Sequence, residues 1–402
     1  MKKKLLLTGL LVFLLGFPMT ATAGIDLGPL TIGGAMRANY LIGDYAETSP
    51  SQPSGAEDDG GNFVLDTFRI NMDYEQGPWI GKLEYRFYDG YNFLHTGWVG
   101  YNFQDDSQLQ VGVNRVPFGP GPYGISQSWF FDQHYYVGLS DDMDLGAKYT
   151  MSVDKLTLDF GYYAMSEGDY FGATKDAARY SYDVVDESED GYEEEHQFNI
   201  RAIYPIEMGD ITTDLGVSLQ YGLLNSNGPQ DDGDHYAGSI HAVNQLGNWK
   251  LAAQLTYYEY DVEYEDPRGE ELVQFGAYDF PTLVAAEAMI PAVSLSYYLE
   301  TPQVDWLDYM IPYAEYSSIM KDESAHNDSE MIVLGSAWAR GGWYIYTDLA
   351  FSNGNDFVGG ESGYLTAGDV ASGAPFFTSN RIGENTTDDW EYRFNINFGY
   401  YF

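Results

Sequence analysis

The sequence predicts an all-β fold, a transmembrane antiparallel β-barrel of sixteen strands, and three observations lead to it. Apolar and polar residues alternate over segments of roughly ten residues, the length of a strand that crosses a membrane. The connections between these segments are short and long in turn along the chain. The first residues have the pattern of an export signal, and no later apolar run is long enough for a membrane-spanning helix.

The amino-terminal segment, residues 1–23, is predicted to be a Sec-type signal peptide. Three lysines at 2–4 precede an apolar run over 5–17, and small residues stand just before Gly24, where cleavage is expected. The apolar run is shorter than the roughly 20 residues that a spanning helix needs, which argues against a retained membrane anchor. We therefore expect a single domain over 24–402 that crosses the membrane with strands.

The composition fits strands that face two different environments. The chain has a net charge of −42, contains 36 tyrosines and has a mean hydropathy of −0.32. Apolar residues that alternate with polar ones give a modest mean hydropathy without any long apolar run. An exported chain without cysteine has neither disulfides nor thiolate metal sites. We expect no cofactor and no nucleic-acid partner.

The strands are identified by a period of two, because successive side chains of a strand point to opposite sides. The last strand is the clearest, since every second residue from Trp390 to Phe402 is apolar while Glu391 and Arg393 lie between. We predict strands at 31–41, 63–74, 79–88, 93–103, 108–116, 142–151, 155–164, 195–205, 211–222, 234–246, 248–260, 291–299, 309–319, 330–339, 342–352 and 389–402.

The lengths of the connections are the most diagnostic feature. Successive antiparallel strands run up and down, so every second connection emerges on the same side of a barrel. The short ones are 75–78, 104–107, 152–154, 206–210, 247, 300–308 and 340–341. The others are 42–62, 89–92, 117–141, 165–194, 223–233, 261–290, 320–329 and 353–388, of which only 89–92 is short. Short periplasmic turns opposite long extracellular loops are typical of an outer-membrane barrel.

Parity within the strands assigns an outward apolar face and an inward polar face. The outward residues are Ile32, Met36, Tyr40, Phe68, Ile70, Met72, Tyr74, Leu83, Tyr85, Phe87, Leu145, Ala147, Tyr149, Leu156, Leu158, Phe160, Leu215, Val217, Leu219, Leu251, Ala253, Leu255 and Tyr257. Tryptophans near strand ends would mark the membrane interfaces, namely Trp79, Trp249, Trp343 and Trp390. Strands 93–103, 309–319 and 330–339 have mixed parity, so their faces stay unassigned.

Basic residues on the inward parity predict a basic wall in the lumen. The wall consists of Arg37, Arg69, Lys82, Arg86, Lys148 and Arg393, mostly on strands that become neighbours when the barrel closes. Such a patch could hold anions or set a field across a constriction, because walls of low dielectric focus the potential. Alternatively, these charges only form salt bridges along the wall, for example Lys82 with Glu84.

The surplus of acidic residues lies in the long loops, above all in 183–195 and 260–271. We expect these runs to be solvated surface charge. The alternative is binding of divalent cations, since carboxylate oxygens suit calcium and magnesium. Asp186, Asp190 and Gly191 match three positions of an EF-hand loop, but the twelfth position is Gln197 instead of glutamate, so no metal site is assigned there.

The connection 117–142 differs from the other long loops because it is rich in aromatic residues and glycine and poorer in charge. We expect it to fold into the barrel and narrow the pore, although a lid docked on the outside is the alternative. Its candidate constriction residues are Pro117, Phe118, Gly119, Tyr123, Trp129, Asp132, Tyr135 and Asp141. In this interpretation Asp132 and its neighbours face the basic wall.

No enzymatic motif stands out in the sequence. There is no GxSxG, no HExxH and no phosphate loop, and the six histidines are scattered. We therefore expect a channel and not an enzyme. A surface receptor or adhesin that uses the acidic loops is the second class of function to consider.

The whole pattern resembles the bacterial general porins, given sixteen strands, short turns opposite long loops, an inward third loop and a terminal Phe402. The resemblance implies passive diffusion of small hydrophilic solutes and ions across the outer membrane, usually by a homotrimer. It also implies contact with outer-membrane lipid and lipopolysaccharide, and recognition of Phe402 by the barrel-assembly machinery.

A narrower resemblance is to the phosphate-selective porin O and P family. It is carried by VGVNRVPFG at 111–119 and DLGAKY at 144–149. It implies an anion-selective or phosphate-selective pore with a constriction lined by basic residues. The segment 117–142 departs from that pattern, because it contains no lysine or arginine and does contain Asp132, Asp141 and Asp142.

Overall fold

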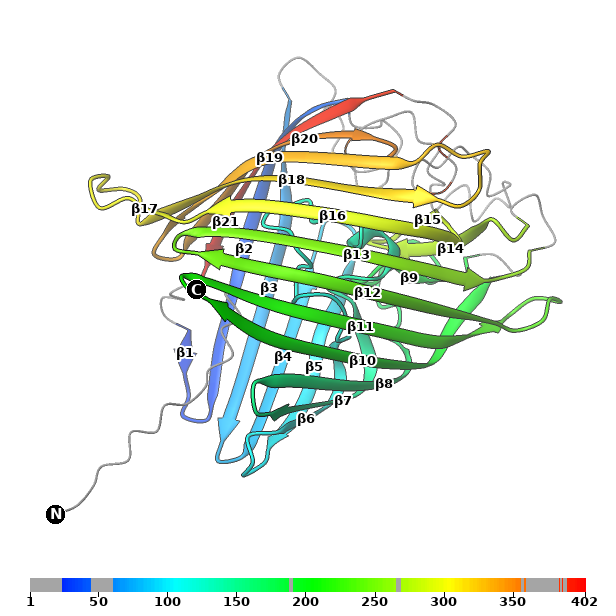
Figure 1. The fold of residues 1–402 in the computed structure, drawn as a ribbon, viewed down its shortest axis with the longest axis horizontal. Helices are drawn as coiled ribbons and strands as arrows, with labels where there is room; N and C mark the ends of the chain where they lie inside the picture. The colour runs from blue at the N-terminus through cyan, green and yellow to red at the C-terminus, as the bar shows by residue number, and fades with distance from the viewer. Residues whose placement is uncertain are drawn as a thin grey trace.

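The computed structural model describes residues 24–44, 61–187, 191–264, 269–355, 358, 383, 385 and 389–402. The expected signal peptide lies outside these residues. In the described part no helix is long and apolar enough to cross a membrane. Sixteen long strands form a closed antiparallel barrel (Figure 1), as the sequence predicts. They are β2 (Leu30–Gly43), β3 (Asn62–Gln76), β4 (Trp79–Phe87), β5 (Asn92–Asn102), β6 (Gln108–Arg115), β7 (Met143–Val153), β8 (Leu156–Ser166), β10 (Tyr192–Met208), β11 (Ile211–Ser226), β12 (Gly233–Leu246), β13 (Trp249–Asp261), β16 (Glu287–Tyr297), β18 (Tyr309–Lys321), β19 (Ser329–Arg340), β20 (Trp343–Asn353) and β21 (Glu391–Tyr401).

Each long strand pairs with its neighbours in sequence, and β2 pairs with β21 to close the wall. The closing register runs from Ala35 opposite Tyr401 to Gly43 opposite Arg393. Closure removes both sheet edges, which would otherwise expose unpaired backbone groups to the membrane. Two short strands extend this sheet, β1 (Ile25–Asp26) along β2 and β17 (Leu299–Glu300) along β18.

The connections segregate by length at the two ends of the barrel, which we call the turn end and the loop end. The turn end holds 77–78, 103–107, 154–155, 209–210, 247–248, 298–308 and 341–342. The loop end holds 44–61, 88–91, 116–142, 167–191, 227–232, 262–286, 322–328 and 354–390. Gly77 and Gly247 have φ of 61° and 56°, a left-handed conformation that suits glycine in two-residue hairpin turns. The predicted alternation is confirmed, including the short connection at 88–91.

The outward face of the wall is apolar, as predicted. Large hydrophobic side chains of the expected band remain exposed on it, among them Met36, Phe68, Leu83, Phe87, Leu145, Phe160, Leu215, Val217, Leu219, Leu251, Leu255 and Tyr257. At the turn end, exposed tryptophans pack beside tyrosines of the adjacent strand, with ring centroids 5.0 Å apart for Trp79 and Tyr101, 4.6 Å for Trp249 and Tyr297, and 5.0 Å for Trp343 and Tyr400. Exposed Trp390 precedes β21 at the loop end.

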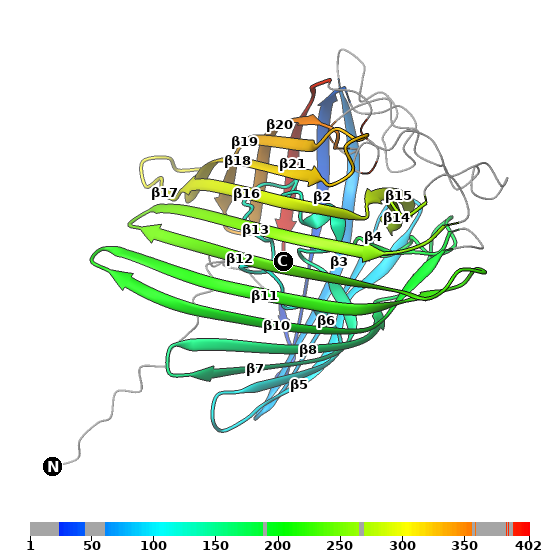
Figure 2. The same ribbon diagram turned by 45° about the vertical axis from the view of Figure 1, so that its right-hand side comes forward.

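The strands of mixed parity have apolar residues on both faces because their inner face packs against protein. On β18 and β19 the buried residues of the inner face include Tyr313, Ile319 and Val333, which belong to the hydrophobic core, while Met320 and Leu334 are exposed on the outside. Figures 1 and 2 show ribbon of the inner loops, in teal, inside the wall formed by the long strands. A strand packed on both sides loses its polar alternation.

Candidate functional site in the lumen

Residues 116–142, which we call loop 3, cross the lumen from the β6–β7 side to the opposite wall. Gly119 donates from its backbone N–H to Ser218 Oγ on β11 at 3.1 Å, and its φ of 65° allows the chain to turn there. His134 Nε2 lies 2.8 Å from Thr256 Oγ1 on β13. The prediction that this loop folds inward is therefore confirmed.

The far side of the wall binds loop 3 through buried carboxylates. Glu315 on β18 accepts hydrogen bonds from Ser126 Oγ at 2.7 Å and from the Gln127 backbone N–H at 2.5 Å. Asp348 on β20 accepts one from the Trp129 backbone N–H at 2.9 Å. Hydrogen bonds to charged acceptors are stronger than neutral ones, so these two carboxylates hold the loop in position.

Two more loops, 167–191 (loop 4) and 262–286 (loop 6), pack onto loop 3. They build a small antiparallel sheet from β9 (Asp183–Val184), β14 (Leu272–Ala277) and β15 (Phe280–Ala285), whose residues are all buried. In loop 3 the only helical turn among the described residues, η1 (Tyr135–Val137), presents Tyr135 to Tyr180 and Tyr182 of loop 4, with ring centroids 6.1 and 5.4 Å apart. We call the three loops together the plug.

The expectation that the acidic run 183–195 is solvated is wrong for several of its residues. Asp183, Asp186, Glu187 and Glu194 are all buried, whereas Glu193 and Glu195 are exposed. Glu187 accepts hydrogen bonds from the backbone N–H groups of 175–177, at 2.8 to 2.9 Å. These carboxylates order loop 4 by binding its own backbone, which a count of charges along the sequence does not reveal.

Three members of the predicted basic wall form a cluster of ion pairs on β2, β3 and β4. Arg37 Nε lies 2.9 Å from Asp66 Oδ2. Arg69 and Arg86 share one carboxylate, that of Glu84, at 3.1 and 2.6 Å. Lys82 is not the partner of Glu84, because it lies 4.0 Å from Asp73 instead.

The other predicted wall residues are more dispersed. Lys148 donates from Nζ to the backbone carbonyl of Arg115 at 2.6 Å. Arg393 is buried against loop 3, with its guanidinium 5.2 and 5.3 Å from the ring centroids of Trp129 and Phe130. Arg393 thus anchors the loop from β21, in the manner of a cation–π contact.

The predicted constriction residues divide into buried and exposed members. Pro117, Phe118, Gly119, Asp132, Tyr135 and Asp141 are buried, Trp129 is half-buried, and Tyr123 is exposed. Asp132 does not face the basic wall. Its two oxygens accept hydrogen bonds from the backbone N–H groups of Ile125 at 3.2 Å and His134 at 2.9 Å.

The acid of loop 3 that meets a basic residue is Asp141. Its Oδ1 accepts from Arg115 Nε at 2.7 Å and its Oδ2 from Tyr180 Oη at 2.5 Å. Burial raises the pKa of the Asp141 carboxyl, and the nearby guanidinium opposes that shift. Tyr123 lies on the accessible side of this pair, with its ring centroid 6.0 Å from the Arg115 guanidinium.

Two further sequence predictions concern Asp186 with Asp190, and Phe402. Asp190 lies outside the described residues, and Asp186 Oδ2 accepts from Lys175 Nζ at 2.6 Å. Phe402 continues β21, because it exchanges backbone hydrogen bonds with Gly34 of β2 at 3.0 and 2.8 Å. Its role as an assembly signal stays a prediction.

Sequence reasoning missed loop 6 as part of the plug, although a signal for it was present. The segment 272–285 is rich in apolar residues, and Asp279 is its only charged residue. The same criterion that assigned loop 3 to the interior therefore applies to this segment.

Comparison with solved structures identifies proteins that share this architecture. The DcaP outer-membrane channel of Acinetobacter baumannii superposes with a TM-score of 0.58 at 10% identity, covering 93% of this chain and 97% of that one. OmpT of Vibrio cholerae, expressed in the outer membrane, superposes with a TM-score of 0.53 at 15% sequence identity, and the match covers 94% of this chain and 100% of OmpT. The anion-selective porin of Comamonas acidovorans superposes with a TM-score of 0.52 at 12% sequence identity, and the match covers 93% of this chain and 99% of that porin.

The chain has a porin fold. No family model and no curated protein matches its sequence. Sequence identities of 10 to 15% show a shared fold alone, and the function of this chain depends on its own residues.

Proposed function

We propose that this protein is a porin of the bacterial outer membrane, through which small hydrophilic solutes and ions diffuse passively. The observation that carries the proposal is a closed wall, apolar outside and charged inside, with a loop bound across its lumen. The exposed apolar band suits lipid, and the tryptophan and tyrosine pairs at the turn end suit the membrane interface. Catalysis is not part of this proposal.

We infer that the path is narrowest between loop 3 and the wall of β2, β3 and β4, because Tyr123 of loop 3 is exposed on that side, beside the Arg115 guanidinium. There three ion pairs have the cation as the more exposed partner, whereas nearer the turn end the Asp73 side chain is more exposed than Lys82, at 60% against 43%. The exposed fractions of the side chains are 16% against 8% for Arg37 and Asp66, 16% against 7% for Arg69 and Glu84, and 33% against 1% for Arg115 and Asp141. At these three pairs a passing ion meets the guanidinium group before it meets the carboxylate.

This unequal exposure favours the second candidate, a channel that prefers anions. Exposed arginines in a narrow, low-dielectric passage lower the energy of an anion and raise that of a cation. Selectivity for phosphate, as in the O and P family, has less support, because loop 3 itself offers no lysine or arginine. A preference for small anions in general is the form that these residues support.

Planar-bilayer recording tests both statements with the pure full-length protein. A porin gives ohmic conductance steps that grow with salt concentration, and a salt gradient gives a reversal potential whose sign reports the preferred ion. The absence of steps from correctly folded protein would refute the channel. A cation-selective reversal potential would leave the channel intact and refute the preference for anions.

The assembly and partners proposed for this porin follow from its surface and from the similar structures. V. cholerae OmpT has been solved in a trimer form, and the outward apolar band of this chain could serve the same contact. We propose a homotrimer in contact with outer-membrane lipid and lipopolysaccharide, assembled through recognition of Phe402 by the barrel-assembly machinery. Crosslinking in intact membranes that gives only monomers would refute the trimer.

A further inference from the structure

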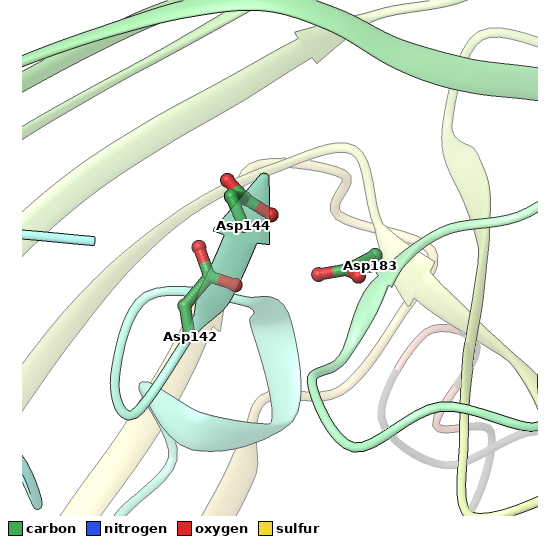
Figure 3. A group of neighbouring side chains, drawn as sticks. All are labelled: Asp142, Asp144 and Asp183. Atoms are coloured by element: carbon green, nitrogen blue, oxygen red, sulfur yellow. The ribbon is translucent and has the colours of Figure 1, made fainter. Parts of the chain in front are cut away.

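Three aspartates meet where loops 3 and 4 of the plug reach the start of β7. Asp142 ends loop 3, Asp144 lies at the start of β7, and Asp183 belongs to β9 in loop 4. One carboxylate oxygen from each lies within 4.8 Å of the others. Figure 3 shows the three carboxylates pointing toward one another.

Two of these carboxylates have oxygens without a hydrogen-bond partner. Asp142 is 5% exposed and Asp144 is 1% exposed, yet Oδ1 of each is unpaired. A buried charged oxygen without a partner destabilises the folded state unless a cation or a proton neutralises it. Since both orphan oxygens belong to the cluster, the missing partner belongs there as well.

The protein itself supplies too little positive charge for this cluster. Arg179 Nη1 lies 3.1 Å from Asp183 Oδ2, and among the described residues it is the one cation that forms an ion pair with the cluster. Glu167 and Glu194 add two more buried carboxyls nearby. Burial, together with these neighbouring carboxylates, raises the pKa of the Asp142 carboxyl well above its ordinary value.

We propose that Asp142, Asp144 and Asp183 bind one divalent cation, with Ca²⁺ as the ion that fits best. Oxygens that share one Ca²⁺ at 2.3–2.6 Å lie at most roughly 5 Å apart, which matches the spacing of the cluster. All the donors are hard oxygens, and neither sulfur nor imidazole is among the three, which disfavours zinc and copper.

Further oxygens are present to complete a calcium shell of six to eight ligands. Gln197 donates from Nε2 to Asp144 Oδ2 at 3.1 Å, and its own Oε1 is unpaired. Glu167 is not among the carboxylates within 4.8 Å of one another; its Oε1 accepts from the Ser181 backbone N–H at 2.8 Å and its carboxyl interacts with Asp183. The adaptable coordination of Ca²⁺ suits such a mixed set of donors better than the strict octahedron of Mg²⁺.

The cation would connect all three loops of the plug to the wall. Asp142 holds the end of loop 3, where its backbone carbonyl accepts from the Val116 N–H at 2.9 Å, so both ends of the loop meet there. Asp183 lies in β9, which pairs with β14 of loop 6 at Gly276. A single ion thus joins loops 3, 4 and 6 to the first residues of β7.

Calorimetric titration of the folded, chelator-treated full-length protein with CaCl₂ tests the proposal without any transport measurement. We expect one saturable site per chain. The double variant Asp142→Asn with Asp144→Asn should weaken binding at that site at least about tenfold, because ligand charge sets affinity. The matched control is Asp210→Asn with Asp305→Asn, which removes the same charge from exposed positions at the turn end.

Hydrogen exchange of the backbone amides in 176–187 provides the second measurement and serves if the double variant fails to fold. In the wild-type protein Ca²⁺ should slow exchange there, by the stabilisation that a bound ligand confers. No saturable binding, or equal weakening in the control variant, would overturn the proposal. A second outcome would also overturn it, namely exchange that does not respond to Ca²⁺ in either protein and is slower in the double variant than in the wild type. That result would indicate that protons neutralise the cluster, because asparagine resembles a protonated aspartate.

Discussion

The barrel wall and the plug differ in how they distribute apolar and charged residues, although they share one lumen. In the wall, apolar residues such as Val217 point outward and stay 49% exposed, while Glu84 and Arg86 are buried inside. In the plug, tyrosines and phenylalanines such as Phe275 form the centre, and carboxylates are buried around them.

The difference shows which interactions specify each region. In the wall, apolar and polar residues alternate with a period of two, as in any strand between lipid and water. The sequence of each strand alone therefore determines which of its side chains face the lipid. The plug depends on contacts between residues far apart in the sequence, such as Gly276 with Asp183 or Trp129 with Asp348. Changes in the wall should therefore affect assembly of the barrel, and changes in the plug should affect the passage.

The largest effect is expected from a charge on the outer face of the wall. Val217→Arg places a guanidinium against lipid and should cost about 2–4 kcal/mol near the bilayer midplane. The measurement is the fraction of folded barrel in denaturant titrations in lipid vesicles. Asp73→Arg is the matched control, since its side chain is 60% exposed in the lumen. Equal destabilisation by both would mean that the two faces do not meet different solvents.

The next effect concerns the passage and not assembly. Replacing 119–140 of loop 3 by a short glycine and serine linker should raise single-channel conductance severalfold, because the segment spans the lumen and binds the far wall. The wall should still fold, since its strand pairs are independent of the loop. The control shortens 227–232, a loop-end connection between β11 and β12. Unchanged conductance after removal of 119–140 would contradict the role of loop 3 as the constriction.

A smaller, local effect is expected from the anchor of loop 3 on β20. Asp348→Asn keeps an oxygen that can accept from the Tyr313 hydroxyl but places an amide NH₂ against the Trp129 N–H, and one unpaired buried donor costs about 1–3 kcal/mol. We expect faster hydrogen exchange at Trp129 and noisier open-channel current, with the denaturation midpoint of the barrel nearly unchanged. Asp305→Asn, at an exposed position of the turn end, is the control. A fall of the midpoint as large as that of Val217→Arg would show that plug and wall unfold together.

These differences explain how far the sequence could predict the structure. All sixteen strands and the inward path of loop 3 are visible in local sequence patterns. The strands alternate apolar and polar residues because one face meets lipid, and loop 3 is rich in aromatic residues because it packs inside the barrel. The partners of Glu84 are not visible, since parity does not distinguish Lys82 from Arg86 along β4, and Arg69 is a diagonal neighbour on β3. The cluster of Asp142, Asp144 and Asp183 could not be predicted either. Loop 4 brings Asp183 to the start of β7 only once the plug is packed.

The smallest expected effect separates the charge of the narrow region from that of the rest of the protein. Arg115→Gln removes the most exposed guanidinium of the narrow region and leaves Asp141 with Tyr180 as its partner. The local charge becomes more negative by one unit, so the reversal potential in a salt gradient should move toward cation preference by several millivolts. Lys155→Gln is the matched control, because Lys155 lies at the turn end and pairs with exposed Glu207 at 3.2 Å.

The double variant Arg115→Gln with Asp141→Asn refines this measurement, because it restores the local charge while the guanidinium stays absent. If the net charge of the narrow region sets ion preference, the double variant should return toward the wild-type reversal potential. If the exposed guanidinium itself attracts the anion, the double variant should stay shifted, because the buried carboxylate contributed little to the field in the passage. The unequal exposure of Arg115 and Asp141 favours the second result. An equal shift from Lys155→Gln would instead place selectivity in the wall as a whole.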